Sequence, residues 1–355
     1  MEIQTPKQLG YIMPPEWREH SSVWAALPYD PVSFPERVEK VQDEFCRMLS
    51  VLEGQEKINL LVGNETAKTK VLKKLKKYGL TEDGVNLKIH LADYADIWTR
   101  DYLPTYLIHG KGKKLAAVHW RYNGYGNKFP ELVKDGKVPD RLKKELGADD
   151  WFEPGIIMEG GAVEVNGKGT LITTEQCLLN PNRNSGKTKN EIEKILKDFL
   201  GVSSVIWLKE GIIYDPTDGH IDDFARFTDE RTILCAYEND PEHPNHAILD
   251  EAYNTLIRAI DQDGQPFKVV KLPMPRMEFD RPIYFGTKVA PVSYANFYIA
   301  NQSVLVPQFN DKNDAPALEI IQSLFPNRLT IGIDCTDLIY GGGAIHCITQ
   351  QQPAV

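Results

Sequence analysis

Apolar residues along the chain alternate between two spacings. Short apolar runs with the length of buried strands are separated by segments in which apolar residues recur every three or four positions, as on one face of an amphipathic helix. In the first such segment Val38, Val41 and Phe45 share a face, and Gly54 is placed to end the helix. The pattern predicts five strand–helix–strand units: 23–27, 36–53 and 58–62; then 65–78 and 85–90, continuing from 58–62; 170–173, 188–200 and 204–208; 232–235, 246–261 and 267–270; and 304–306, 314–324 and 329–333.

These units favour one closed α/β assembly over two separate domains. The chain has 355 residues, more than a single core usually holds, but no Gly/Ser-rich linker divides it. We therefore predict a single domain over residues 1–355. A doubly wound open sheet would show the same alternation of strands and helices, and this pattern alone does not separate the two architectures.

A polar segment follows each unit and leads into another short strand. If the units are arranged around an axis, these segments converge at one end of it, and their carboxylates, histidine and cysteine share one pocket. The five segments are 98–101, 158–161, 219–223, 293–296 and 341–347.

One cysteine stands out by its context. Cys347 closely follows three consecutive glycines, 341–343, which permit unusual backbone angles and a close approach of the main chain to a ligand. A cysteine in such a place is a candidate nucleophile, although most free cysteines are buried structural thiols. Cys46, Cys177 and Cys235 lie within apolar helix or strand patterns, and we interpret them as structural.

His220 and Asp222 are two residues apart, so on an extended segment they point to the same side. A histidine there could protonate a leaving group and then activate water, because its pKa lies near working pH. A hydrogen-bonded structural histidine is the competing interpretation. His346 would point away from its neighbour Cys347 on a strand, which favours a structural role.

Composition narrows the class of function. Hydrophobic residues make up 42% and charged residues 26%, as in ordinary globular enzymes, and the net charge of −9 argues against a nucleic-acid partner. The sequence has no apolar run of the ~18 residues needed to span a membrane and no basic, apolar start typical of a secretory signal. Its five cysteines include no CxxC pair, so a disulfide framework or cysteine zinc site is not expected and a cytoplasmic location is predicted.

Motifs for nucleotides and metals are incomplete. The run 185–188 is similar to the end of a phosphate-binding loop, but Pro181 stands where that loop needs a glycine. His243 and His246 lie in a Pro-rich stretch without the glutamate of a metalloprotease helix. We expect neither a metal nor another cofactor to be needed.

Taken together, the motifs resemble those of the agmatine deiminase branch of the guanidino-group-modifying enzymes. The likeness runs over nearly the whole chain, and each motif alone is modest, whereas the full set in this order is highly specific. The matching segments are 13–17, 96–101, 159–161, 178–184, 219–222, 296–301 and 341–351.

The resemblance implies a five-bladed α/β propeller (the pentein fold) with pseudo-fivefold symmetry. It also implies hydrolytic deimination of agmatine to carbamoylputrescine and ammonia through a cysteine thiouronium intermediate. A planar guanidinium is well matched by paired carboxylates. The implied roles are Cys347 as nucleophile, His220 as general acid and base, Asp101 and Asp222 as guanidinium ligands, Glu159 beside His220, and Asp96, Trp98, Asn296 and Gly343 as substrate contacts.

Three departures leave the substrate open. The family commonly has asparagine where this chain has Ala344 and Asp223, and a small or neutral residue at Arg226. The partner is expected to be a small cationic guanidino compound, and association into a homo-oligomer is left open. Free or peptidyl arginine is the main alternative to agmatine, with Arg226 or Arg100 as the counter-ion for the α-carboxylate of free arginine. Amidino transfer to an amine and ligand binding without turnover are further alternatives.

Overall fold

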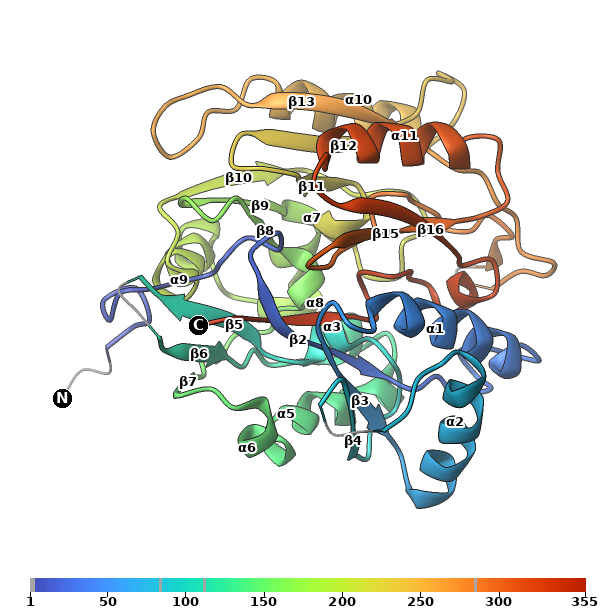
Figure 1. Ribbon diagram of the computed structural model, residues 1–355. Helices are drawn as coiled ribbons and strands as arrows, with labels where there is room; N and C mark the ends of the chain where they lie inside the picture. Colours follow the sequence, from blue (N-terminus) through green and yellow to red (C-terminus); the bar gives the residue numbers. More distant parts are fainter. Residues whose placement is uncertain (1–3, 83–84, 111–112, 284–285) are drawn as a thin grey trace.

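The computed structural model describes residues 4–82, 85–110, 113–283 and 286–355, and it shows a mixed α/β fold (Figure 1). The strands within these residues form five separate sheets, two with four strands and three with three. In sheet order they are β17 (Gln350–Pro353), β2 (His20–Ala26), β3 (Lys57–Val62) and β4 (Leu87–Leu91); β1 (Tyr11–Ile12), β5 (Thr105–His109), β6 (Leu115–Val118) and β7 (Asp150–Phe152); β10 (Ser204–Leu208), β9 (Thr170–Thr174) and β8 (Glu164–Val165); β11 (Ala225–Phe227), β12 (Thr232–Tyr237) and β13 (Lys268–Pro273); and β14 (Tyr298–Ile299), β15 (Ser303–Gln308) and β16 (Leu329–Asp334).

Every sheet contains the same three-stranded arrangement. A central strand pairs antiparallel with one neighbour and parallel with the next, as β9 does with β8 and β10. The parallel partner is reached through a helical crossover, since parallel strands cannot be joined by a tight turn. In the first sheet β17, the last strand of the chain, supplies the antiparallel strand to β2, so the C-terminal segment pairs with a strand that lies early in the sequence. The recurrence expected from the sequence is therefore present in the strand pairing.

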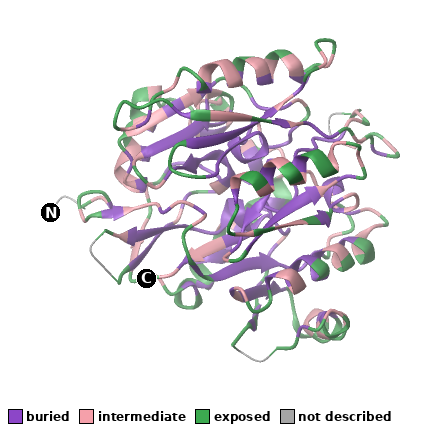
Figure 2. Ribbon diagram, turned by 45° about the horizontal axis from the view of Figure 1, so that its top comes forward, coloured by how far each residue is buried: buried purple, intermediate pink, exposed green. Residues whose placement is uncertain are grey.

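The longer helices lie outside the sheets, with one face buried and the other exposed (Figure 2). In α1 the buried face includes Phe45, Met48 and Leu49, and Gly54 follows the helix with φ +75°, as its predicted end requires. No helix among the described residues is both long and apolar enough to cross a membrane. The α-helices are α1 (Val38–Leu52), α2 (Glu65–Lys77), α3 (Thr99–Tyr102), α4 (Gly124–Asn127), α5 (Val138–Arg141), α6 (Lys143–Leu146), α7 (Glu175–Leu178), α8 (Pro181–Asn184), α9 (Lys189–Leu200), α10 (Asn245–Leu256) and α11 (Asp314–Leu324).

The prediction of a second unit after strand 58–62 is wrong. Strands β2, β3 and β4 are all parallel in one sheet, so α1 and α2 both belong to the first unit. The unit that the sequence pattern missed is the one built on β5, β6 and β7. Between β6 and β7 the chain forms short helices, among them the 3-10 helix η1 (Pro130–Lys137), so no long amphipathic period marks it. The predicted helix 246–261 also ends earlier, at Leu256.

The polar segments lie just before the antiparallel strand of each unit, as predicted. α3 precedes β5, the 3-10 helix η2 (Gly160–Ala162) precedes β8, and the 3-10 helix η3 (Ile221–Asp223) precedes β11. The residues before β14 include Asn296, and the 3-10 helix η5 (Leu338–Gly341) leads to the segment before β17. The repeated architecture thus places one polar segment before the antiparallel strand of each sheet.

Candidate active site

Cys347 is held by Asn296. The side-chain amide of Asn296 donates to Cys347 Sγ at 3.0 Å, and its oxygen accepts from the backbone N–H groups of His346 (3.0 Å) and Cys347 (3.3 Å). Cys347 is 4% exposed, and its Sγ lies 3.8 Å from Asp222 Oδ2. Asn296, predicted as a substrate contact, is thus placed first of all to position the thiol; contact with a substrate stays a prediction.

The glycines before Cys347 have two different structural roles. Gly342 has φ +98° and ends η5 in the left-handed region, where glycine is favoured. Gly343 gives space, because a Cβ there would lie 2.9 Å from the Trp98 ring and 3.0 Å from Cys347 Sγ. A side chain at position 343 would therefore cover the thiol.

His220 is fully buried among carboxylates that it does not quite reach. Its Nδ1 lies 3.7 Å from Asp101 Oδ1 and 4.0 Å from Asp222 Oδ1, and its Nε2 lies 3.8 Å from Glu159 Oε2. Neither ring nitrogen, nor Glu159 Oε2, nor Asp222 Oδ1 has a hydrogen-bond partner. Buried polar atoms without partners are rare in folded proteins, so this set indicates a place for a polar ligand.

The carboxylates are fixed from behind. Asp101 accepts from the Tyr125 hydroxyl at 2.7 Å and from the backbone N–H of Gly161 at 2.9 Å. Asp222 Oδ2 lies 2.6 Å from His346 Nδ1. Two oriented carboxylates that flank one space can accept the paired N–H groups of a guanidinium.

Burial and these neighbours set the protonation states. Burial raises the pKa of Asp101 to about 6, with His220 opposing the shift. Burial also raises the pKa of the Cys347 thiol well above its ordinary value, and Asp222 and Asp223 add to this. Although burial opposes it, Asp101 and Glu159 help to raise the pKa of His220 well above its usual range. Without a ligand the site therefore holds a protonated thiol and an imidazolium.

A narrow cavity leads to the thiol. Trp98 forms part of its wall, and Asp96 lies behind Trp98, whose indole N–H donates to Asp96 Oδ2 at 3.0 Å. Asp96 is absent from the cavity lining, so its carboxylate orients Trp98, and direct contact with a substrate stays a prediction. The described lining contains neither lysine nor arginine and consists of Trp98, Asp101, Tyr125, Phe129, Leu132, Pro216, Thr217, Gly342, Gly343 and Cys347.

Sequence reasoning missed Tyr125 and Arg183. Tyr125 has φ +56° in α4, and the glycines at 124 and 126 on either side of it were the available signal. Arg183 is buried and donates to Glu159 Oε1 at 2.8 Å and to the Thr217 carbonyl at 2.8 Å, so it ties Glu159 to the cavity wall. It lies in the motif 178–184, which suggested the family but no role for Arg183.

The arginines considered as counter-ions for an α-carboxylate do not reach the cavity, and that hypothesis is wrong. Arg226 is fully buried and donates to Glu16, Glu164 and two backbone carbonyls. Arg100 donates to Gln351 and to a backbone carbonyl. Both guanidinium groups are committed to the interior of the fold.

The other two positions at which this chain differs from the family pattern lie close to Cys347. Ala344 is buried, and Asp223 Oδ1 accepts from the Asn296 amide at 2.9 Å. Asp223 therefore shares the amide that holds the Cys347 thiol, and it faces the nucleophile from the side of Asp222.

Gly161 lies within the cradle formed by His220 and the two aspartates. A Cβ at this position would lie 2.7 Å from His220 Nδ1, 2.9 Å from Asp222 Oδ2 and 3.0 Å from Asp101 Oδ1. These three groups would all have to move to admit one methyl group. Only glycine leaves the space between them open.

We therefore expect Gly161→Ala to lower kcat/KM by about 100-fold, since displacing aligned groups by a fraction of an ångström to 1 Å can cost that much. Steady-state kinetics with a small guanidino substrate, together with a thermal melt, measures this. The matched control is Gly63→Ala, because a Cβ at Gly63 meets nothing within 4 Å. Activity of Gly161→Ala within twofold of the control would contradict the proposed cradle.

Comparison with known proteins places this site in a family. A profile described as the Porphyromonas-type peptidyl-arginine deiminase matches residues 12–353. A Legionella pneumophila (strain Paris) protein, named provisionally as an agmatine deiminase, is 36% identical over 98% of this chain and 97% of its own. The structure of the agmatine deiminase of Enterococcus faecalis is 30% identical, with a TM-score of 0.89 over 100% of this chain and 99% of that one. A substrate-bound C. jejuni agmatine deiminase with one cysteine replaced by serine is 28% identical, with a TM-score of 0.83 and 96% of each chain covered.

The fold and these likenesses define the class of protein: a hydrolase that acts on guanidino C–N bonds. The chain belongs to the Porphyromonas-type peptidyl-arginine deiminase family. Its likeness to agmatine deiminases, expected from the motifs, is confirmed over the full length.

Proposed function

We propose that the protein hydrolyses agmatine to carbamoylputrescine and ammonia, with Cys347 as nucleophile. One observation supports agmatine over arginine: the described cavity lining contains no cation that could pair with an α-carboxylate. Agmatine has no carboxylate. Its distal ammonium instead meets the aromatic rings of Trp98, Tyr125 and Phe129, whose faces attract cations.

The proposed reaction starts with the guanidinium between Asp101 and Asp222. The sulfur of Cys347 attacks the guanidinium carbon as a thiolate, and His220 donates a proton to the departing nitrogen, so that ammonia leaves. The substrate carbon is then bonded to the Cys347 sulfur in a covalent thiouronium intermediate. Neutral His220 takes a proton from water, and the hydroxide adds to the carbon to give a neutral tetrahedral adduct. The carbon–sulfur bond then breaks, and the hydroxyl proton of the adduct passes to the departing sulfur, so that the Cys347 thiol and a neutral ureido product are released.

Glu159 and Arg183 serve this scheme without touching the reacting carbon. Glu159 faces His220 Nε2 at 3.8 Å and stabilises the imidazolium, while Arg183 holds the other oxygen of Glu159. We infer that this keeps the Nδ1 edge of His220 turned toward Asp101 and Asp222, where the proton is needed.

We also infer that the five sheets close into a five-bladed propeller with pseudo-fivefold symmetry, in one domain over residues 1–355. Two facts support this: the same strand pairing recurs in all five sheets, and β17 joins the C-terminal end of the chain to β2. All five cysteines are free and buried, which favours the reducing cytoplasm as the compartment.

The test offers agmatine, free arginine and an arginyl peptide in parallel to the purified protein, and measures both ammonia and ureido product. We expect agmatine to be turned over with a kcat/KM at least about 100-fold above that for arginine, because an unpaired carboxylate would have to be desolvated. Cys347→Ala should abolish turnover.

Each alternative has its own outcome in this assay. Preference for arginine or for the peptide would keep the chemistry and reject agmatine. Ammonia-free consumption of agmatine in the presence of an amine acceptor would indicate amidino transfer. Binding without consumption of any of the three would reject catalysis of this reaction.

A further inference from the structure

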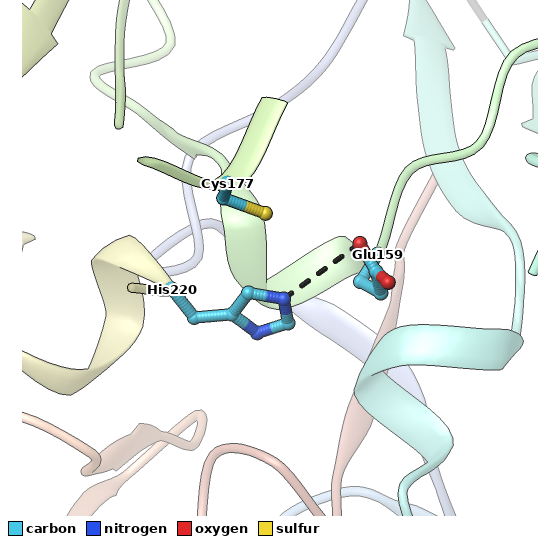
Figure 3. Close-up of side chains that lie close together, drawn as sticks. All are labelled: Glu159, Cys177 and His220. Atoms are coloured by element: carbon cyan, nitrogen blue, oxygen red, sulfur yellow. Dashed lines mark ion pairs between the residues drawn. The ribbon is translucent and has the colours of Figure 1, made fainter. Parts of the chain in front are cut away.

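Cys177 lies against the general acid–base histidine, on the side away from the guanidinium space. Cys177 lies in α7, and its sequence context predicts only a buried structural thiol. Figure 3 shows the thiol and the Glu159 carboxylate both turned toward the same edge of the His220 ring. One ligand atom from each of these residues lies within 4.8 Å of the other two, and all three residues are 0% exposed.

Two of the three ligand atoms of this cluster lack hydrogen-bond partners. His220 Nε2 and Glu159 Oε2 have no hydrogen-bond partner, and they are 3.8 Å apart. The other Glu159 oxygen is held by Arg183, so the free oxygen is directed at the ring. Two buried, unpaired atoms that face one point indicate a missing ligand there.

The spacing is close to that of a tetrahedral site. Zinc binds nitrogen and oxygen at about 2.0–2.2 Å and sulfur at about 2.3 Å, which places a nitrogen and an oxygen ligand about 3.3–3.6 Å apart. The separation of 3.8 Å between His220 Nε2 and Glu159 Oε2 is slightly wider than this, so a small movement of either side chain brings both atoms to one ion. Imidazole, thiolate and carboxylate are also the ligand types that zinc and cobalt prefer, and three of them leave one position open.

We propose that Glu159, Cys177 and His220 form a binding site for one thiophilic divalent cation, such as Zn²⁺ or Co²⁺. The ion binds through Cys177 thiolate, His220 Nε2 and Glu159 Oε2, and the protons of the thiol and of the imidazolium leave as it enters. Two positive charges replace two protons, so the net charge of the buried cluster is unchanged.

The ion is an inhibitor and not a cofactor. His220 Nε2 faces the cluster, whereas Nδ1 faces Asp101 and Asp222, so the ion lies behind the ring and leaves the guanidinium space open. With the ion on Nε2 the ring keeps a proton on Nδ1, but donating that proton would leave an imidazolate in place of a neutral imidazole, so the ring is a far weaker acid than the imidazolium that the leaving nitrogen needs. Resting on the proposed function, this predicts that Zn²⁺ lowers kcat for agmatine and changes KM little.

Two other clusters of possible metal ligands give weaker support for a metal site. His119, Asp140 and Glu153 include two exposed acids, and such groups are common without an ion. Asp222, Asp223 and Cys347 face the guanidinium space itself, so an ion there would compete with substrate. This difference lets kinetics and mutation separate the two buried clusters.

The first experiment measures binding of Co²⁺ alone, without substrate, by the thiolate-to-cobalt charge-transfer band and by equilibrium dialysis. We expect one ion per chain in the wild type, in Cys347→Ala and in the matched control Cys235→Ala, whose thiol is buried in β12. Cys177→Ala and the more conservative Cys177→Ser should lose the band and bind at least about tenfold more weakly.

The outcomes are decisive without any enzyme assay. Absence of the band in the wild type overturns the proposal, as does its survival in folded Cys177→Ser or its loss in Cys347→Ala, which would move the ion to the nucleophile. A thermal melt of each variant checks folding. If Zn²⁺ binds but agmatine is not turned over, the proposed function fails and the ion site stands.

Discussion

Replacing Arg226 by alanine will destabilise the protein by about 3–5 kcal/mol, the usual cost of removing one partner from a buried ion pair. Arg226 is 0% exposed and bonds two carboxylates, Glu16 at 2.8 Å and Glu164 at 3.1 Å. Its other amino group donates to the carbonyls of Ala295 and Phe297. The alanine variant leaves both carboxylates and both carbonyls without these bonds, and chemical denaturation measures the loss.

Arg226→Lys is the matched variant, because it keeps the charge but cannot reproduce the forked set of donors. We expect it to fold with an intermediate loss of stability and to keep the wild-type order of preference among agmatine, arginine and an arginyl peptide. A folded lysine variant that exchanged agmatine for arginine would show that position 226 controls specificity, contrary to its burial here.

The same residue reaches the reaction centre through two others. Glu16 Oε2 lies 2.8 Å from Arg226 Nη2 and 2.7 Å from His346 Nε2, and the opposite nitrogen of His346 lies 2.6 Å from Asp222. Despite burial, Arg226 and His346 hold the pKa of Glu16 well below its ordinary value. Arg226 is therefore the far end of a buried chain that orients one of the two guanidinium-binding carboxylates. Loss of activity in Arg226→Lys should accordingly be uniform across substrates.

Sequence reasoning succeeded where one local pattern carries the information. Alternating apolar periods located most strands and helices. Motif order predicted Cys347, His220, Glu159, Asp101 and Asp222, which the fold places close together, while their catalytic roles stay predictions. It failed for the sheet of β5, β6 and β7, because the chain between β6 and β7 forms short helices without a sustained period. It also divided one sheet into two units, since strand order within a parallel sheet is a long-range property that periodicity does not record.

Contacts between segments that are distant in the sequence were the main features that sequence reasoning did not predict. Cys177 lies in an apolar helical pattern, and nothing near it indicates that the fold places it beside His220. Arg226 and Arg100 could be proposed as substrate ligands only because their partners, such as Glu16, are far away in the chain. His346 was expected to point away from Cys347, and its contact with Asp222 depends on residues 124 positions apart.

Binding of a guanidine will convert the Cys347 thiol into its thiolate. In the free protein, burial and the nearby Asp222, Asp223 and Asp101 raise the pKa of the thiol well above its ordinary value, so the thiol is protonated at neutral pH. A guanidinium between Asp101 and Asp222 adds a positive charge beside the sulfur and offsets these carboxylates, which lowers the thiol pKa. Guanidine binding therefore lowers the pKa of the Cys347 thiol. The thiolate forms only at alkaline pH without the ligand, and it forms at lower pH when the ligand is bound.

The measurement is the ultraviolet absorbance of the thiolate as pH is raised, with and without an unreactive guanidine. One opposite charge at this range shifts a pKa by about 1–3, so the thiolate fraction at neutral pH should rise at least about tenfold. Cys347→Ala supplies the background, which includes any thiolate of Cys177 beside His220. Two of the other cysteines, Cys46 and Cys235, have a pKa raised to about 12 by burial. Thiolate already present at neutral pH in the free protein would contradict substrate-assisted ionisation. It would mean instead that the thiol is activated before the cation arrives.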